Sequence, residues 1–301
     1  MAKTLRKIQK PKRAYVFWFF LILAIPLAIF ILGYASGYRL DKTSRTIIKT
    51  SALSIYTTPS NAHITINGEL LDNTTPFIQT FQPGTYHVVV SKEGYHSWET
   101  TTTLDTNTSA LFADVVLFPQ SQLTLEESSP KKEQMLRLAT DEEMHTLSSA
   151  TFVALDDAVL LLSGPQTLVI DETKKTYAVF DTALDTLFYA ASGSVVAAEW
   201  HEDTLLIATT HEIVTYNKNR NDVSLVTRQA TSIRDALFTS NGAHVIFVDA
   251  LGLHAIEAYP NNVHARTQLS AEKDMINIRI AKDPERVYMD ISGKTFSLNL
   301  E

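Results

Sequence analysis

Two short clusters of histidine and carboxylate side chains are the residues best suited to binding a metal ion. His201-Glu202-Asp203 and His211-Glu212 stand on either side of an apolar segment that we expect to form a strand. Imidazole nitrogens and carboxylate oxygens are ligands that zinc and related ions take from proteins. Polar residues at strand ends also serve solvation alone, and we predict that role here, with no metal site.

Three further histidines, His63, His87 and His96, lie in an earlier part of the chain and could form a metal trio. Successive residues of a strand point to opposite faces. The alternating strand positions of these histidines do not place them on one face, so we expect no metal there.

Three aromatic residues in the same part, Tyr86, Tyr95 and Trp98, could form a stacking platform for a carbohydrate. The alternative is packing in a core and against turns, and that is the interpretation we favour.

Other chemistry has little support. The chain has no G-x-S-x-G elbow, phosphate-binding loop, H-E-x-x-H motif or EF-hand spacing. Asp156-Asp157 precedes an apolar segment and is predicted to be a turn, not a calcium loop. The 301 residues include no cysteine, which excludes disulfides, thiolate metal sites and cysteine nucleophiles. We therefore predict no catalytic, cofactor-binding or metal-binding residues and no enzyme activity.

Charge is distributed unevenly along the chain. Six basic residues and no acidic residue precede Tyr34, which leaves 20 of the 26 basic residues against all 33 acidic residues, a balance of −13 for the remainder. Such a surface repels phosphates, so nucleic acid is not an expected partner.

An uncharged segment, Tyr15 to Tyr34, is long enough to cross a bilayer as a helix. Aromatic residues stand at both of its ends, where they favour the membrane interface, and Pro26 lies in the middle. The preceding basic residues predict a cytoplasmic N-terminus and an exported remainder. The alternative is a signal peptide cleaved near Ala35-Ser36-Gly37.

After a polar stalk, short alternating apolar segments separated by turns predict a small antiparallel β-domain. Asn67-Gly68 is the dipeptide that best adopts a type I′ hairpin turn. Pro83-Gly84 and Glu93-Gly94 mark two more turns, and Pro119 ends the last strand.

The order of these landmarks resembles the PEGA domain, a small β-sandwich of bacterial and archaeal surface proteins. The matching residues are Thr58-Pro59-Ser60-Asn61-Ala62 in place of the Pro-Glu-Gly-Ala signature, then Asn67-Gly68, Thr75-Pro76, Pro83-Gly84-Thr85-Tyr86 and Lys92-Glu93-Gly94-Tyr95 with Trp98. Ser60 and Asn61 depart from the signature, but Asn tolerates the positive φ of such a turn. The resemblance implies an extracytoplasmic interaction or spacer module without catalysis.

The C-terminal part repeats a pattern of apolar segments with a period near 40 to 45 residues, which is typical of propeller blades. The repeated segments begin at Val159, Leu205, Val245 and Val287, each with a predicted strand before and after it. The pattern is similar to WD- and Tol-type propellers, with Ser240-Asn241-Gly242 resembling their turn before the central strand.

About four blades fit, so the closure of the array has three explanations: a four-bladed ring, an open array, or two chains that complete a larger ring. The last unit stops at its third strand. We predict that Gln122 to Leu125 or Met135 to Leu138 supplies the missing strand.

The predicted organisation is mainly β. Its parts are a basic cytoplasmic tail (1–14), a transmembrane helix (15–36), a stalk (37–51), a PEGA-like β-sandwich (52–119), a linker (120–134) and a β-propeller-like domain (135–301). We expect a non-enzymatic protein of the bacterial cell membrane, with its C-terminal domains outside the cytoplasm. The expected partners are the lipid bilayer, through residues 15–36, and an envelope protein or surface glycan, with a homo-oligomer of this chain as a further option. A ligand- or glycan-binding sensor and a propeller-type hydrolase or lyase are the alternatives.

Overall fold

A computed structural model describes residues 12–35, 37–40, 47–106, 108–128, 130, 137–138, 140, 158–163, 166–181, 186–259, 265–282 and 285–300. These residues form one helix and 26 strands. The chain divides into two compact units. One comprises Met1–Ile55, Phe77–Tyr86 and Thr102–Leu111, and the other Tyr56–Pro76, His87–Thr101 and Phe112–Glu301.

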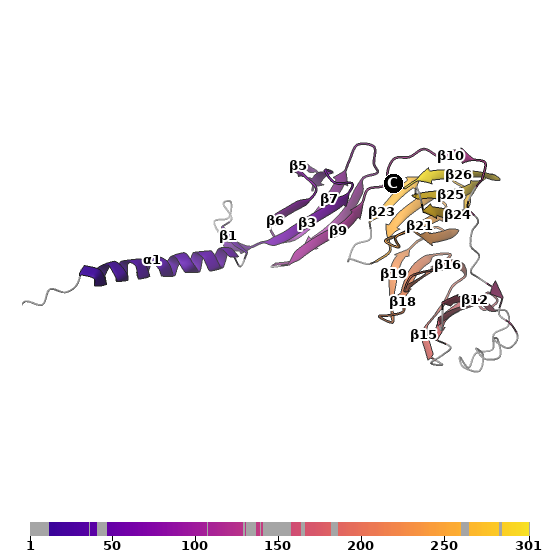
Figure 1. Cartoon of the computed structure of the whole chain (residues 1–301), viewed down its shortest axis with the longest axis horizontal. Helices are drawn as coiled ribbons and strands as arrows, with labels where there is room; N and C mark the ends of the chain where they lie inside the picture. Colours follow the sequence, from indigo (N-terminus) through magenta and orange to yellow (C-terminus); the bar gives the residue numbers. More distant parts are fainter. Residues whose placement is uncertain are drawn as a thin grey trace, which may run out of the picture. The chain divides into compact units, whose positions relative to one another are not determined.

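The helix α1 (Lys12–Ala35) confirms the predicted apolar helix (Figure 1). Its segment Phe17–Ala35 has a mean hydropathy of 2.4 and is not covered by the rest of the chain. Among the described residues it is the one helix apolar and long enough to cross a membrane. Such a helix fits a membrane anchor, and it fits a signal sequence as well. Residues 1–11 of the predicted basic tail lie outside the described residues.

The predicted small β-domain consists of two sheets, preceded by a hairpin of β1 (Tyr38–Leu40) and β2 (Ile47–Lys49). The three-stranded sheet has the order β6-β3-β9, with β3 (Ser51–Thr58), β6 (Phe77–Phe81) and β9 (Ser109–Val116). β3 and β6 are antiparallel, but β3 and β9 run parallel, because the Ala52 N–H donates to the Thr108 carbonyl before β9 and the Leu117 N–H after β9 donates to the Thr58 carbonyl. The expected antiparallel arrangement is therefore wrong for this pair. The four-stranded sheet has the order β5-β4-β7-β8, with β4 (His63–Ile66), β5 (Glu69–Thr74), β7 (Gly84–Ser91) and β8 (Trp98–Leu104).

The turns of this domain follow the sequence. Asn67 and Gly68 join β4 to β5 with φ values of 51° and 85°, and a type I′ turn requires positive φ at both central residues. Asn61, which stands where the PEGA signature has Gly, has a φ of 59°. The Asn side chain therefore preserves the turn, as expected.

Four further antiparallel sheets, here called blades 1 to 4, follow one another along the chain (Figure 1). Blade 1 contains β11 (Arg137–Leu138), β12 (Ala158–Ser163), β13 (Gln166–Asp171), β14 (Thr176–Asp181) and β15 (Thr186–Ser192). Blade 2 contains β16 (Val195–His201), β17 (Thr204–Thr209), β18 (Glu212–Asn217) and β19 (Asp222–Arg228). Blade 3 contains β20 (Asp235–Phe238), β21 (His244–Asp249), β22 (Gly252–Glu257) and β23 (Arg266–Ser270). Blade 4 contains β24 (Met275–Lys282), β25 (Glu285–Ile291), β26 (Lys294–Asn299) and β10 (Thr124–Glu126).

These sheets confirm the predicted repeat. The four apolar segments form β12, β17, β21 and β25, and each pairs with the strand that follows it. The strand expected at Phe152-Val153 and the turn at Asp156-Asp157 lie outside the described residues. Among the described strands, those of blade 1 make no substantial contact with those of blade 4. Within the part of the chain that the structure describes, no strand pairing joins blade 1 to blade 4.

Blade 4 ends the array with a polar face. The central strands β17 and β21 are buried throughout, whereas β25 alternates between buried and half-buried residues. On the half-buried face, Asp290 accepts hydrogen bonds from Arg279 (Nη1 to Oδ2, 3.2 Å) and Thr295 (Oγ1 to Oδ1, 3.0 Å). A repeat with only one neighbour needs such a face, because a second apolar face would be exposed to water.

The missing strand of blade 4 comes from the segment before the array. Thr124 pairs with Ser297 and Glu126 with Thr295, which confirms the predicted use of Gln122 to Leu125. The Glu126 carboxylate also accepts a hydrogen bond from Ser297 Oγ at 2.6 Å. The segment that we predicted as a linker, 120–134, thus contributes a strand to the last blade.

Carboxylates connect successive blades. Glu199 in β16 accepts a hydrogen bond from the backbone N–H of Phe238 in β20 at 3.1 Å. Asp235 in β20 accepts one from the N–H of Ile278 in β24 at 3.0 Å. Each bond satisfies a backbone donor that would otherwise be unpaired at the strand edge, which fixes one blade against the next.

Candidate functional site

The structure uses the first predicted metal-ligand cluster for structural contacts. The His201 ring lies 3.1 Å from the carbonyl oxygen of Ser240 and packs on Phe238, with ring centroids 5.6 Å apart. Glu202 is exposed in the turn after β16, and Asp203 forms an ion pair with Lys218 at 2.6 Å.

The second cluster is also separated into local contacts. His211 Nδ1 lies 3.0 Å from the Thr210 hydroxyl, and Arg228 Nε donates to Glu212 at 2.8 Å. Across the residues that the structure describes, no three His, Asp or Glu side chains come together as a metal site.

The histidine trio differs from our expectation in one respect. His63 and His87 are both exposed and lie on the same face of the four-stranded sheet, because His63 pairs with Ser91, four residues beyond His87. Along the strands, however, the residue opposite His63 is Ser91, so four residues separate that position from His87. His96 lies in the β7–β8 loop, where burial lowers the pKa of its imidazole.

The three aromatic residues serve packing. Trp98 is 3% exposed and packs edge-on against Phe112, with ring centroids 5.2 Å apart. Tyr86 is half-buried, and its hydroxyl donates to the carbonyl of Gln82 at 2.7 Å. Tyr95 is half-buried and forms an isolated bridge with Pro119. A side chain buried as deeply as Trp98 offers no face for stacking on a sugar.

The segment after β9 connects the β7–β8 loop to the blades. His96 N–H donates to the carbonyl of Phe118 at 2.8 Å. The Phe118 side chain is 4% exposed and lies in one core cluster with Val287 and Leu298 of blade 4. The chain therefore passes from β9 into the core of the blades without a free linker at this point.

A small cavity of about 90 Å³ lies beside this segment. The lining residues come from the end of β9 and from blade 3: Phe112, Ala113, Asp114, Val115, Ala243, His244, Glu257 and Tyr259. This volume is several times what one water molecule requires. The cavity thus has room for a small polar head group.

Two carboxyl groups and one imidazole line this cavity. Glu257 Oε1 accepts a hydrogen bond from the indole N–H of Trp98 at 3.3 Å. Burial raises the pKa of Glu257, an effect that the Trp98 bond opposes and the nearby Asp114 carboxylate reinforces. Burial also lowers the pKa of His244 to about 4, against the opposing influence of Asp114. At neutral pH the imidazole of His244 is therefore uncharged beside two carboxyl groups.

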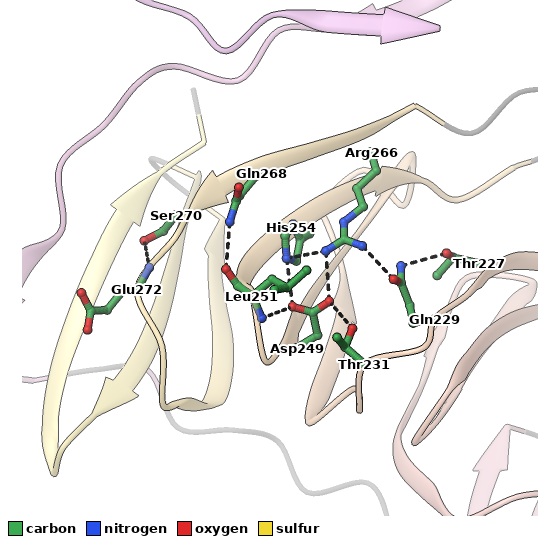
Figure 2. Close-up of polar contacts among 10 residues, drawn as sticks. All are labelled: Thr227, Gln229, Thr231, Asp249, Leu251, His254, Arg266, Gln268, Ser270 and Glu272. Atoms are coloured by element: carbon green, nitrogen blue, oxygen red, sulfur yellow. Dashed lines mark hydrogen bonds and ion pairs between the residues drawn. The ribbon is translucent and has the colours of Figure 1, made fainter. Parts of the chain in front are cut away.

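A second polar cluster lies at the turn between β21 and β22 (Figure 2). Asp249 Oδ1 accepts from the backbone N–H of Leu251 at 2.7 Å, and Oδ2 accepts from the Thr231 hydroxyl at 2.9 Å and from Arg266 Nη2 at 3.0 Å. His254 Nε2 lies 3.0 Å from Asp249 Oδ1. Burial, together with the Arg266 charge, lowers the pKa of His254 to about 4.

This second cluster is structural. The side chains of Asp249 and His254 are 0% and 2% exposed, so no substrate reaches them. Arg266 Nη1 donates to Gln229 at 2.7 Å, and both Gln229 and Thr231 belong to the connection between blades 2 and 3. The cluster therefore fastens that connection to the turn of blade 3. The cavity beside Trp98 is the better candidate for a functional site.

Sequence reasoning missed both polar clusters. Asp114, His244 and Glu257 come from three strands that no short motif links. Asp249 and His254 are five residues apart across a tight turn, a spacing that carries a signal only when the turn between β21 and β22 is already known.

Comparisons with known proteins agree with part of the sequence interpretation. Residues 50–115 match the model of the PEGA domain, which confirms the resemblance. No curated protein gives a significant match.

Several solved structures match the chain. BamB from Moraxella catarrhalis is 9% identical, with 83% of this chain and 96% of that chain covered and a TM-score of 0.36. The Cps50 (Swd1) β-propeller domain of Myceliophteria thermophila is 10% identical, with 89% and 94% covered and a TM-score of 0.39. At such identities and scores, nothing about function is carried over from these proteins.

Proposed function

We propose that this chain, which carries a PEGA domain at residues 50–115 between an apolar helix and an array of four blades, is a membrane-tethered docking protein of the cell envelope. The helix anchors the chain in the membrane with its N-terminus in the cytoplasm. The PEGA domain and the blades lie outside the cytoplasm and present a surface to another envelope component.

The observation that carries this proposal is the continuity of the chain from the PEGA domain into the blades. Phe118 is buried among blade 3 and blade 4 residues directly after β9, and β10 completes blade 4. A partner bound to the blades would thus be held by folded structure connected to the PEGA domain instead of by a free linker. Such a connection suits a platform that positions a partner near the membrane.

The α1 helix supports the tether. Its apolar side chains from Phe17 onward are exposed in the chain itself, and a surface of this kind is stable in a bilayer but not in water. Aromatic residues at both ends, among them Trp18 and Tyr34, suit the two interfaces.

The test is crosslinking of the full chain in membranes, followed by isolation through a C-terminal tag. Docking predicts a defined crosslinked partner that disappears when blade 3 is disrupted by Asp249→Ala but persists in a matched surface variant, Glu272→Gln. Recovery of the protein alone, from cells that express it at native levels, would contradict docking.

A further inference from the structure

The cavity beside Trp98 is lined by the exposed Asp114 and the half-buried Glu257, two carboxylates for which no described residue supplies a positive charge. Asp114 and Glu257 form no ion pair with any lysine or arginine that the structure describes. Burial already disfavours the charged form of Glu257, and the second carboxylate adds repulsion. A bound cation would relieve both costs, because it places an opposite charge within the same cavity.

His244 adds a separate indication of a ligand. It is 5% exposed and lines the same cavity, yet no described residue hydrogen-bonds its ring nitrogens. The ring nitrogens are not among the described buried atoms that lack a partner, so they reach accessible space, where water or a ligand can pair with them. The neutral imidazole offers a lone pair, which accepts a hydrogen bond from a donor in the cavity.

The remaining walls suit a cation on a short apolar stem. Phe112 and Tyr259 are aromatic residues that line the cavity, Phe112 being buried against Trp98 and Tyr259 being 39% exposed. Aromatic rings attract ammonium groups and pack against methylene groups. A primary ammonium has three N–H donors, which matches the two carboxylates and the imidazole in number.

We propose that this cavity is a binding site for a primary ammonium group, and that its ligand is the lysine side chain of the docking partner. The site gives the proposed docking function its point of contact and in that respect depends on it. Asp114 and Glu257 supply the charge, His244 accepts one N–H, and Phe112 and Tyr259 pack against the stem.

The experiment titrates the full chain in nanodiscs with n-butylamine hydrochloride at pH 7.5 and constant ionic strength. The readout is the indole N–H signal of Trp98 in ¹⁵N-tryptophan-labelled protein, assigned with Trp98→Phe, because this indole donates directly to Glu257. We expect a saturable shift with n-butylammonium and at least tenfold weaker binding of n-butanol, which has the same length and no charge. Equal affinities for the two probes would overturn the site.

Variants distinguish the contribution of the negative charge in the cavity from that of its volume. Glu257→Gln keeps an acceptor for Trp98 but removes the charge, and should weaken butylammonium binding at least tenfold. Glu272→Gln, at an exposed acid elsewhere, should leave it unchanged. Ala243→Leu fills the cavity without changing its charge and should abolish binding. Undiminished binding to either Glu257→Gln or Ala243→Leu would overturn the site.

A blocked Gly-Lys-Gly peptide distinguishes a lysine side chain from a free amine. Binding of this peptide, with loss on Nε-acetylation, supports a lysine of a partner. Binding of butylammonium without binding of the peptide would overturn the lysine ligand. These measurements use isolated protein. Their failure would overturn the lysine site without contradicting docking. Failure of the crosslinking in membranes would contradict docking without contradicting the cavity as an ammonium site.

Discussion

The indole nitrogen of Trp98 donates a hydrogen bond to the carboxylate of Glu257, 159 residues further along the chain, at 3.3 Å. Trp98 opens β8 of the PEGA domain, and Glu257 ends β22 of blade 3. The bond therefore joins two parts that the sequence presents as separate domains. It also holds in place one wall of the cavity that we propose as a binding site.

Trp98→Phe should lower the free energy of unfolding by about 2 kcal/mol, because it removes a donor to a partly buried carboxylate and leaves that group unsatisfied. Urea denaturation of the full chain, followed by circular dichroism, measures the change. Trp200→Phe is the matched control, since the Trp200 indole nitrogen is buried without a described partner. A cost for Trp200→Phe as large as that for Trp98→Phe would show that the hydrogen bond is not the cause.

Stability should fall as the pH falls from about 6.5 to about 4. His244 and His254 each have a pKa of about 4 in the folded chain, against 6.5 when unfolded. Between these values the unfolded chain binds more protons, so acidification favours unfolding, by up to about 3 kcal/mol for each histidine at 1.4 kcal/mol per pKa unit. Above pH 6.5 this contribution is constant.

Urea midpoints measured from pH 7.5 to pH 4.5 test this dependence. His244→Phe and His254→Phe should each reduce the slope, whatever they do to stability at pH 7.5. Slopes parallel to that of the unaltered chain would show that these two imidazoles do not remain neutral in the folded state.

Gly242→Ala should destabilise the chain by about 2 kcal/mol or more. Gly242 has a φ of 68°, and a Cβ at this position would lie 2.5 Å from His201 Nδ1. The left-handed conformation alone costs a residue with a Cβ about 1–2 kcal/mol, and the clash adds to it.

A double-mutant cycle separates the two costs at this turn. In a His201→Ala background the clash is absent, so Gly242→Ala should cost only the backbone term, about 1 kcal/mol. An identical cost in both backgrounds would mean that His201 does not press against this turn in solution.

Asp249→Asn should destabilise the chain by about 3 kcal/mol, because it leaves the guanidinium of Arg266 without its counter-charge in a mostly buried setting. The double variant Asp249→Asn with Arg266→Met should recover part of the loss. Thermal unfolding of the four chains measures the coupling, and additive effects would contradict a buried ion pair.

Much of the fold could be predicted from the sequence, because local chemistry determines it. Asn67-Gly68 specified its hairpin through positive φ, and the apolar segments from Val159 onward specified the central strands of four blades by their period.

The candidate site could not be predicted, because it depends on tertiary pairing. Asp114, His244 and Glu257 are unremarkable residues in three separate strands until the segment around Phe118 packs against blades 3 and 4. Trp98 was interpreted correctly as a packing residue, but its partner 159 residues away has no signal in the sequence. The sheet pairing that brings such residues together is long-range, and periodicity reports only local structure.

The orientation of the tethered chain can be measured by labelling single cysteines, because the natural sequence has none. Ser232 is exposed between blades 2 and 3, and Thr4 precedes the apolar helix. A membrane-impermeant maleimide applied to intact cells should label Ser232→Cys, whereas Thr4→Cys should react only after lysis, both on full-length protein in the membrane fraction. Labelling of Thr4→Cys in intact cells with protection of Ser232→Cys, or recovery of a shortened chain lacking residue 4, would contradict a membrane-tethered protein whose blades face outward.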